Sequence, residues 1–192
     1  MKKNTNNKKH SSGFTLIELI VTVSIVAILS SIAAPSFRSM LESNKASVAA
    51  NEMVSVLLLA RSEALKRRNN VTVCTSIDQT TCAGNSEKDF SKGWIVFVDC
   101  DKNQVKATSA TVDCGNAALE AETLIKAGLG TQGMNVNKGG TVANAHYFTY
   151  NFTGRTDVPA TFTVSNKNAS TALKEVVVSL TGRVKTCDGV CP

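Results

Sequence analysis

Six cysteines are the residues of this sequence whose chemistry is easiest to anticipate, because thiols either pair as disulfides or bind metal ions. They are Cys74, Cys82, Cys100, Cys114, Cys187 and Cys191. The gaps of seven, thirteen and three residues within sequential pairs match no common zinc module, and the chain has only two histidines. The sequence therefore predicts disulfides, with no metal site and no other cofactor.

The order in which the cysteines pair is not fixed by their number, since many pairings are open to six cysteines. Loop length favours the sequential set, because each bridge would then close one loop or the C-terminal segment. This set is Cys74–Cys82, Cys100–Cys114 and Cys187–Cys191.

Groups suited to catalysis are scarce. His10 and His146 are the two histidines, and His10 lies in a lysine-rich N-terminal segment. The sequence contains no G-x-S-x-G, Walker or H-E-x-x-H motif. We therefore expect no catalytic residues and a protein that is not an enzyme.

Positive charge is concentrated at the two ends of the chain. Residues 1–13 contain four lysines and no acid, residues 74–125 carry a net charge of −4, and residues 126–192 carry a net charge of +4. The formal charge of +6 therefore reflects a basic leader and a basic C-terminal section, and it does not describe a uniformly basic protein.

The segment 14–34 is apolar over 21 residues and contains one charge, Glu18. At about 1.5 Å per residue, a helix of this length spans roughly one bilayer core. The lysines before it predict a single pass with the N-terminus cytoplasmic and the C-terminus outside. A plain anchor or a cleaved secretory signal is the alternative interpretation of this segment.

The elements after the apolar segment predict an α+β fold. Apolar residues such as Met53, Leu57 and Leu65 continue a three/four spacing to Arg68, which indicates an amphipathic helix. Short β-like runs follow, separated by Gly, Asn and Asp. We expect strands near 71–75, 94–99, 124–127, 147–152, 160–165 and 175–180. The predicted organisation is a leader (1–13), an apolar helix half (14–34), an amphipathic helix half (35–70) and a β-rich globular domain with a basic C-terminal tail (71–192).

The residues around Gly13 carry a first family resemblance. The run G-F-T-L-I-E-L, from Gly13 to Leu19, resembles the class III signal of type IV pilins and type II secretion pseudopilins. The resemblance implies cleavage by prepilin peptidase between Gly13 and Phe14, methylation of the new Phe14 amine, and retention of the apolar segment. Pro35 stands where many pilins have a helix-kinking proline.

Glu18 falls at the fifth position of the mature chain, where this superfamily keeps a glutamate. A lone carboxylate in an apolar span is costly and needs a partner. The resemblance implies that this partner is the N-terminal amine of a neighbouring subunit, which makes Glu18 an assembly residue. The alternative is a solvated carboxylate near the cytoplasmic interface.

Two C-terminal stretches carry a second, narrower resemblance. The runs Y-N-F-T-G-R (150–155) and V-V-V-S-L-T-G-R-V-K (176–185) resemble the FimT/GspH family. This implies an antiparallel β-sandwich packed on the long helix. Within the family, FimT-type minor pilins bind DNA through G-R-x-R in a mobile C-terminal tail. Here the element is Gly182-Arg183-Val184-Lys185, so a lysine replaces the second arginine and keeps its charge without its planar fork.

The implied contact is between basic side chains and DNA phosphates. Asp188 and Glu175 would oppose it. The alternative for Arg183 and Arg155 is a structural arginine paired with an acid or a carbonyl. The candidate DNA-binding residues are Arg183, Lys185, Gly182, Arg155 and Lys174.

Two functions follow from these resemblances. The first is a minor type IV pilin that binds extracellular double-stranded DNA without sequence preference for uptake in natural transformation. The second is a structural minor pseudopilin of a type II secretion system, resembling GspH, with no DNA role. In both cases the partners are prepilin peptidase, the bacterial inner membrane before assembly, and other major and minor pilins in a filament.

Overall fold

The computed structural model describes residues 14–84, 87–108, 112–114, 119–120, 122–139, 146–167 and 171–191. The chain divides into two compact units, Met1–Leu41 and Glu42–Pro192, and each is described by itself. The expected leader 1–13, with the cleavage residue Gly13, lies outside the described residues.

The first unit is the N-terminal part of a single helix, α1, which extends from Leu16 to Arg67. Every residue from 14 to 41 is exposed, including the apolar ones, and Pro35 lies inside the helix. By length and composition, α1 could cross a membrane, with a mean hydropathy of 2.4 in its most apolar window. The apolar side chains of this unit therefore have to be covered by lipid or by other subunits.

In the second unit, α1 buries a stripe of small residues. The buried positions are Ala46, Ala49, Ala50, Met53, Val56, Leu57, Ala60 and Ala64. Alanine on this face lets the helix approach the sheets closely. The larger Leu65, which the spacing also placed on the apolar face, is 49% exposed. The helix ends at Arg67, and the next residue, Arg68, has a left-handed φ of 53°.

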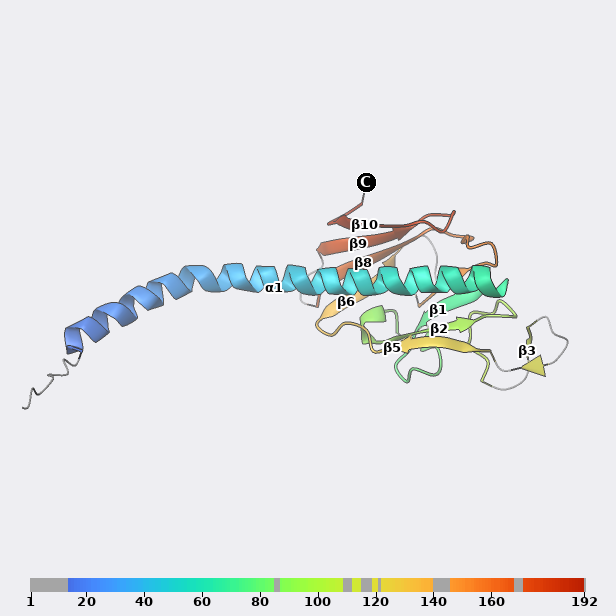
Figure 1. The fold of residues 1–192 in the computed structure, drawn as a ribbon, viewed down its shortest axis with the longest axis horizontal. Coiled ribbons are helices and arrows are strands. Elements are labelled where there is room, and N and C mark those ends of the chain that lie inside the picture. The colour runs from blue at the N-terminus through green and yellow to red at the C-terminus, as the bar shows by residue number, and fades with distance from the viewer. Residues whose placement is uncertain are drawn as a thin grey trace, which may run out of the picture. The chain divides into compact units, whose positions relative to one another are not determined.

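Two four-stranded antiparallel sheets complete the unit (Figure 1). The first has the order β5-β2-β1-β7, with β1 Val71–Thr75, β2 Trp94–Val98, β5 Leu124–Gly128 and β7 Tyr147–Tyr150. The second has the order β10-β9-β8-β6, with β6 Met134–Gly139, β8 Ala160–Asn166, β9 Ala172–Val178 and β10 Val184–Asp188. A short pair, β3 Val112–Asp113 with β4 Leu119–Glu120, and a 3-10 turn, η2 Phe90–Lys92, lie in the connections.

One core joins the helix to both sheets. The alanine stripe of α1 belongs to the same buried cluster as Val71 and Phe148 of the first sheet and Phe162 and Val176 of the second. The predicted α+β class, a long helix packed on an antiparallel β-sandwich, is confirmed.

The six predicted strands are present with shifts of a few residues at their ends, but four further strands were not predicted. Two are the short strands β3 and β4, and the longer two are β6, which lies in a glycine-rich stretch, and β10. Residues 184–188 were expected in a tail, yet they pair with β9 along five residues, from Val184↔Val178 to Asp188↔Lys174. The last strand of the fold therefore follows Arg183 rather than preceding it.

The structure joins the cysteines in sequential order. The bridges are Cys74–Cys82, Cys100–Cys114 and Cys187–Cys191. The first of them covers the outer face of the first sheet, where Cys74 is buried with Ile95 and Phe97 in a second, small core. The third closes a loop directly after β10.

The second unit contains what a domain needs to fold alone. All described core residues lie between Ala46 and Val178, and all three disulfides lie within the unit. No side chain from 14 to 45 is buried, so removing the first unit exposes none of this core. Residues 42–192 are therefore a suitable soluble protein for experiments.

Candidate nucleic-acid interface

Two turns share the sequence Thr-Gly-Arg and carry two of the candidate arginines. The first, residues 153–155, follows β7, and the second, residues 181–183, joins β9 to β10. Both glycines have a positive φ, +70° at Gly154 and +77° at Gly182. Residues with a side chain rarely adopt this conformation, so glycine is what lets the chain reverse at both places.

Hydrogen bonds within each turn fix its shape. The Asn151 side-chain oxygen accepts from the backbone N–H groups of Thr153 at 3.0 Å and Arg155 at 3.2 Å. In the second turn, the Ser179 N–H donates to the Arg183 carbonyl at 3.0 Å, which closes the β9–β10 hairpin. Each arginine therefore leaves a turn whose backbone is held in one arrangement.

The two turns lie against each other. A Cβ atom placed on Gly182 would stand 2.0 Å from the carbonyl oxygen of Gly154 and 3.1 Å from the Tyr150 ring. Arg61 of α1 joins them, because its Nε donates to the Gly154 carbonyl and its Nη2 to the Thr181 carbonyl, each at 3.0 Å. Beneath them Tyr150 is fully buried, and this burial raises the pKa of its hydroxyl. We call the two turns together with the first two residues of β10 the twin-turn site, residues 151–155 and 179–185.

Three of the exposed side chains at the twin-turn site are basic, and Phe152 and Leu180 of the same turns are exposed beside them. Lys185 is the second residue of β10, and the Val184 before it packs against the core, so Lys185 and Arg183 project from the opposite, outer face. Arg155, Arg183 and Lys185 are all exposed. Among the described residues, none of these three side chains makes a hydrogen bond or an ion pair. Their charges are therefore available to a ligand.

Lys174 lies elsewhere. It is directly opposite Asp188 in the β9–β10 ladder, on the inner face of the sheet, whereas Lys185 is on the outer face. Its amine forms an ion pair with the Asp188 carboxylate. Glu175, the other acid expected to oppose the patch, accepts a hydrogen bond from the Cys191 N–H at 2.8 Å. The structure therefore places Arg155 and Arg183 on adjoining turns, with Lys185 following on β10, and separates Lys174 from them.

The residues expected in a mobile C-terminal tail instead form a hairpin turn, a strand and a closed loop. Lys185 belongs to β10, and Gly182 stands in a closed hairpin turn. After β10, the Gly189 N–H donates to the Leu173 carbonyl at 3.0 Å, and the Cys187–Cys191 bridge closes the loop. Any contact through these residues therefore uses a preorganised surface.

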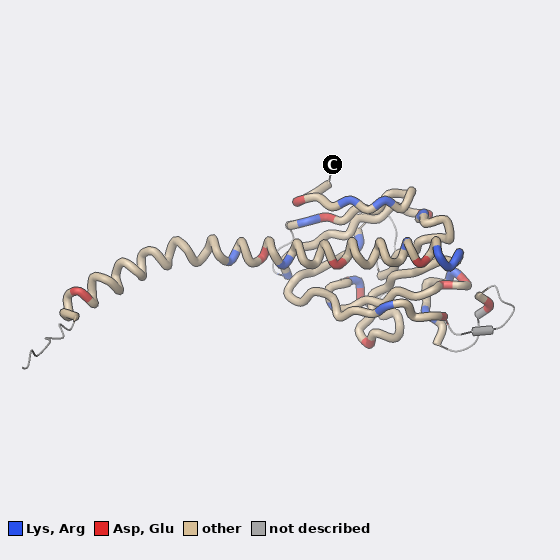
Figure 2. The backbone as a smooth tube through the Cα atoms, in the orientation of Figure 1, with Lys and Arg blue, Asp and Glu red and all other residues tan. Residues whose placement is uncertain are grey.

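A second group of basic residues lies at the C-terminal end of α1. Figure 2 shows Lys and Arg gathered at this end of the helix. Arg67 and Lys66 pair with Glu63 at 2.6 and 3.6 Å, and the Arg67 hydrogen bond holds the pKa of that carboxyl below its usual value. This run therefore fits favourable charges at a helix C-terminus better than a phosphate-binding patch.

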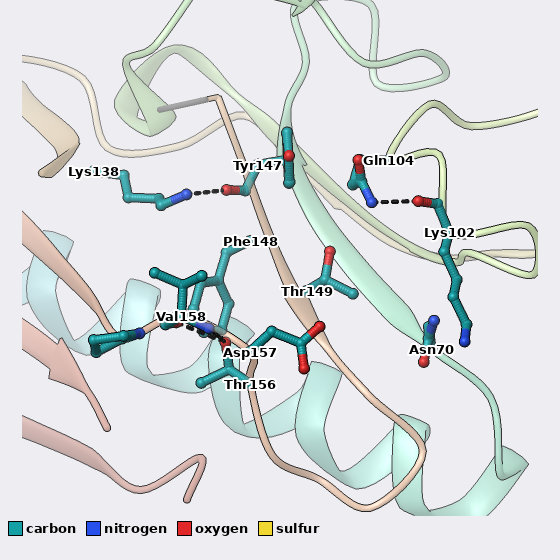
Figure 3. Close-up of a pocket in the computed structure, with 11 residues that line it drawn as sticks. Asn70, Lys102, Gln104, Lys138, Tyr147, Phe148, Thr149, Thr156, Asp157 and Val158 are labelled. Atoms are coloured by element: carbon teal, nitrogen blue, oxygen red, sulfur yellow. Dashed lines mark hydrogen bonds between the residues drawn. The ribbon is translucent and has the colours of Figure 1, made fainter. Parts of the chain in front are cut away.

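A pocket beside β7 offers a different kind of site (Figure 3). Its volume is about 190 Å³, and Asn70, Tyr147 and Asp157 are among its lining residues. Lys138 also lines it and donates to the Tyr147 carbonyl at 2.7 Å, while burial lowers the pKa of its amine to about 8. The pocket is smaller than the roughly 300–1,000 Å³ of typical small-molecule sites. We assign it no function.

Arg61 was not among the residues that the sequence pointed to, and its role can be tested. We expect Arg61→Met to lower the free energy of unfolding by about 2 kcal/mol, because two backbone carbonyls lose a charged donor. Arg61→Lys should lower the free energy of unfolding by a smaller amount, since lysine has no planar group that can donate to both carbonyls. Urea denaturation of residues 42–192 measures the change. Arg67→Met, which removes an exposed helix ion pair, should cost under about 0.5 kcal/mol. Equal losses at the two positions would contradict the bridging role.

Comparisons with known proteins agree with this architecture. Residues 49–182 match the family described as Type II transport protein GspH. Residues 8–34 match the prokaryotic N-terminal methylation motif. A search of curated proteins finds no match.

Solved structures with a similar fold include the type IV minor pilin FimU of Pseudomonas aeruginosa in two crystal forms. The first has a TM-score of 0.52 at 18% identity and covers 76% of this chain and 90% of that chain. The second has a TM-score of 0.50 at 20% identity and covers 73% of this chain and 90% of that chain. The minor pseudopilin EpsH of the Vibrio cholerae type 2 secretion system is also found, with a TM-score of 0.44, 13% identity, and coverage of 75% and 97%.

Proposed function

The chain belongs to the GspH family of minor pilins and pseudopilins, whose members are filament subunits rather than enzymes, and from this premise we propose a DNA-binding role. In this proposal the protein is a minor type IV pilin that binds extracellular double-stranded DNA for uptake in natural transformation. Binding is by charge and is independent of sequence.

One observation carries the proposal, namely the exposed cations of the twin-turn site. Arg155 and Arg183 leave two turns that are fixed to each other, and Lys185 follows on the outer face of β10. Three unpaired cations on two adjoining turns and the strand that follows them suit contact with a phosphate backbone. The backbone that carries these cations is already held in place, so binding a phosphate backbone has to order only their side chains.

The chemistry of these residues favours phosphate contact over base recognition. Arginine donates to two phosphate oxygens at once, while lysine at position 185 supplies charge and reach. Trp94 is buried rather than available for stacking, and the single exposed ring of Phe152 gives no platform for successive bases. Three phosphate contacts predict that log K falls against log salt with a slope of roughly −2 to −3.

Assembly and localisation follow from the first unit. We propose that prepilin peptidase removes residues 1–13, that α1 holds the subunit in the inner membrane with its C-terminal unit outside the cytoplasm, and that the exposed apolar residues 14–41 later pack among other pilins in a filament. The twin-turn site would then be carried at the filament surface.

The test is a mobility shift of a short DNA duplex by oxidised residues 42–192 at several salt concentrations. We expect Arg183→Ala with Lys185→Ala to weaken binding at least tenfold and to reduce the salt slope to about −1, because one of three contacts remains. The melting temperature should not change, since neither side chain has a partner among the described residues. The control is Lys45→Ala with Lys88→Ala, which removes the same charge from exposed positions elsewhere on the unit.

Either of two results would contradict the proposal. Equal loss of binding in the control would show that only net charge matters. Absence of binding by the wild type at high micromolar concentration and low salt would favour the alternative, a structural minor pseudopilin with no DNA role.

A further inference from the structure

Three carboxylates meet at one point in the acidic middle of the chain. Asp99 and Asp101 lie in the loop after β2, and Glu122 stands shortly before β5. One carboxylate oxygen of each lies within 4.8 Å of those of the other two. Asp99 and Glu122 are buried, with exposed fractions of 0% and 2%, and Asp101 is exposed. The cluster is therefore open to solvent on one side only.

One carboxylate oxygen of Asp99 is buried without a partner in the described part of the chain. Its Oδ2 accepts a hydrogen bond from the Thr72 hydroxyl at 2.6 Å, but its buried Oδ1 has no hydrogen-bond partner among the described residues. The backbone N–H groups of Lys102 and Gln104 lie near this carboxylate, but neither completes a hydrogen bond to Oδ1. An unpartnered, buried carboxylate oxygen is costly unless a proton or a cation satisfies it.

No described side chain supplies that cation. None of the ion pairs found in the described part of the chain involves Asp99, Asp101 or Glu122. Glu122 instead accepts from the backbone N–H groups of Cys100 and Ala107, each at 2.8 Å. These bonds hold both its oxygens in place beside the loop and still leave each oxygen a lone pair.

The loop around Asp99 has the ligand spacing of a calcium loop. Oxygen-bearing side chains stand at alternate positions, Asp99, Asp101 and Asn103, and a backbone carbonyl follows at Val105. In EF-hand loops the sixth position is a glycine that makes a sharp turn. Here the sixth residue, Gln104, has a left-handed φ of 61° and makes the equivalent turn. The Asp101 Oδ1 accepts from the Asn103 N–H at 3.1 Å, which keeps these side chains on one side of the loop.

We propose that this loop binds a calcium ion through Asp99, Asp101 and Glu122, with Asn103 and the Val105 carbonyl as additional oxygen ligands. We call it the loop-99 site. Two oxygens that each lie about 2.4 Å from one ion can be at most about 4.8 Å apart, which matches the cluster. All ligands are hard oxygens, and Cys100 is committed to the bridge with Cys114, so zinc and other soft metals are disfavoured. Flexible loop oxygens suit calcium better than magnesium, which demands a strict octahedron.

Binding would have a structural consequence. The Cys100–Cys114 disulfide crosslinks the loop to Cys114, and the Glu122 hydrogen bonds connect it to the segment before β5. A bound ion would add a third connection between the same parts of the chain. Extracellular calcium modules have dissociation constants of about 0.1–1 mM. An affinity in this range would be filled outside a cell and empty inside it.

The test uses oxidised residues 42–192 after removal of divalent ions with a chelator. Titration calorimetry with CaCl2 should show one site per chain, and 10 mM CaCl2 should raise the melting temperature by about 5 °C or more. Asp101→Asn should weaken calcium binding at least tenfold. This variant is suited to the test because Asp101 is exposed and asparagine can still accept the Asn103 hydrogen bond. Asp157→Asn, which removes an exposed acid from another loop, is the matched control and should bind as the wild type does.

Three results would overturn the proposal. The first is a folded wild type with no heat of binding and no thermal shift up to 10 mM CaCl2. The second is an undiminished shift in Asp101→Asn, which would place the ion elsewhere. The third is an equal shift with MgCl2, which would contradict a calcium site.

Discussion

Replacing Gly182 with alanine should lower the free energy of unfolding of residues 42–192 by at least about 3 kcal/mol. A φ of +77° costs a residue with a side chain about 1 kcal/mol or more. The larger part comes from contact, because the added Cβ would stand 2.0 Å from the Gly154 carbonyl oxygen. That oxygen belongs to the other turn and is held by Arg61, so relief of the overlap has to separate the two turns.

Gly189→Ala is the matched control for this experiment. Gly189 has a φ of +70°, and a Cβ placed there would meet nothing within 4 Å. It therefore measures the cost of the backbone conformation alone, expected at about 1 kcal/mol. Urea denaturation of both variants under oxidising conditions isolates the contact between the turns as the difference between them. If Gly182→Ala costs no more than Gly189→Ala, the turns do not touch as described.

The contact between the two turns could not be predicted from the sequence. Both Thr-Gly-Arg motifs were visible, and Arg155 and Arg183 were each named as candidates. Their contact depends on a backbone-to-backbone approach across 28 residues and on Arg61, an ordinary helix residue in the sequence. No local pattern encodes such a contact, because it is made by the packing of α1 against both sheets.

The failure to predict β6 and β10, the two longer of the missed strands, has a related physical cause. In β6, Met134 and Val136 are buried and the intervening residues are polar, but the strand ends in glycine and follows a glycine-rich stretch. In β10, only Val184 packs against the core, so the strand depends on its ladder with β9 more than on its own apolar residues. A weakly apolar edge strand forms mainly because it pairs with the neighbouring strand. Its own sequence therefore gives little indication that it is a strand.

The cluster of Asp99, Asp101 and Glu122 could be predicted only in part from the sequence. The prediction of no metal site rests only on the spacing of cysteine and histidine residues. The net charge of −4 between residues 74 and 125 was recorded as a property of the segment. The D-x-D-x-N spacing from Asp99 to Asn103 was available as a signal, whereas the approach of Glu122 from beyond the disulfide loop required the fold.

The second large effect expected is on filament assembly, and it concerns Glu18. Glu18 carries the only charge between residues 14 and 34, and among the described residues its carboxylate has no ion-pair partner. A carboxylate buried among apolar helices without a partner costs several kcal/mol. We propose that the methylated amine of Phe14 on a neighbouring subunit is this partner, since it stays positively charged.

Glu18→Ala should therefore reduce the amount of this protein in sheared filaments at least tenfold, while its level in the membrane stays unchanged. Glu18→Gln should be equally defective, because it keeps the shape and loses the charge, and Glu18→Asp should retain part of the incorporation. Glu42→Ala, which removes an exposed glutamate outside the apolar segment, is the control and should assemble normally. Quantitative immunoblots of membrane and filament fractions measure both levels. Normal incorporation of Glu18→Ala would rule out the charge pair, since an unpaired amine would then be tolerated in the same apolar surroundings.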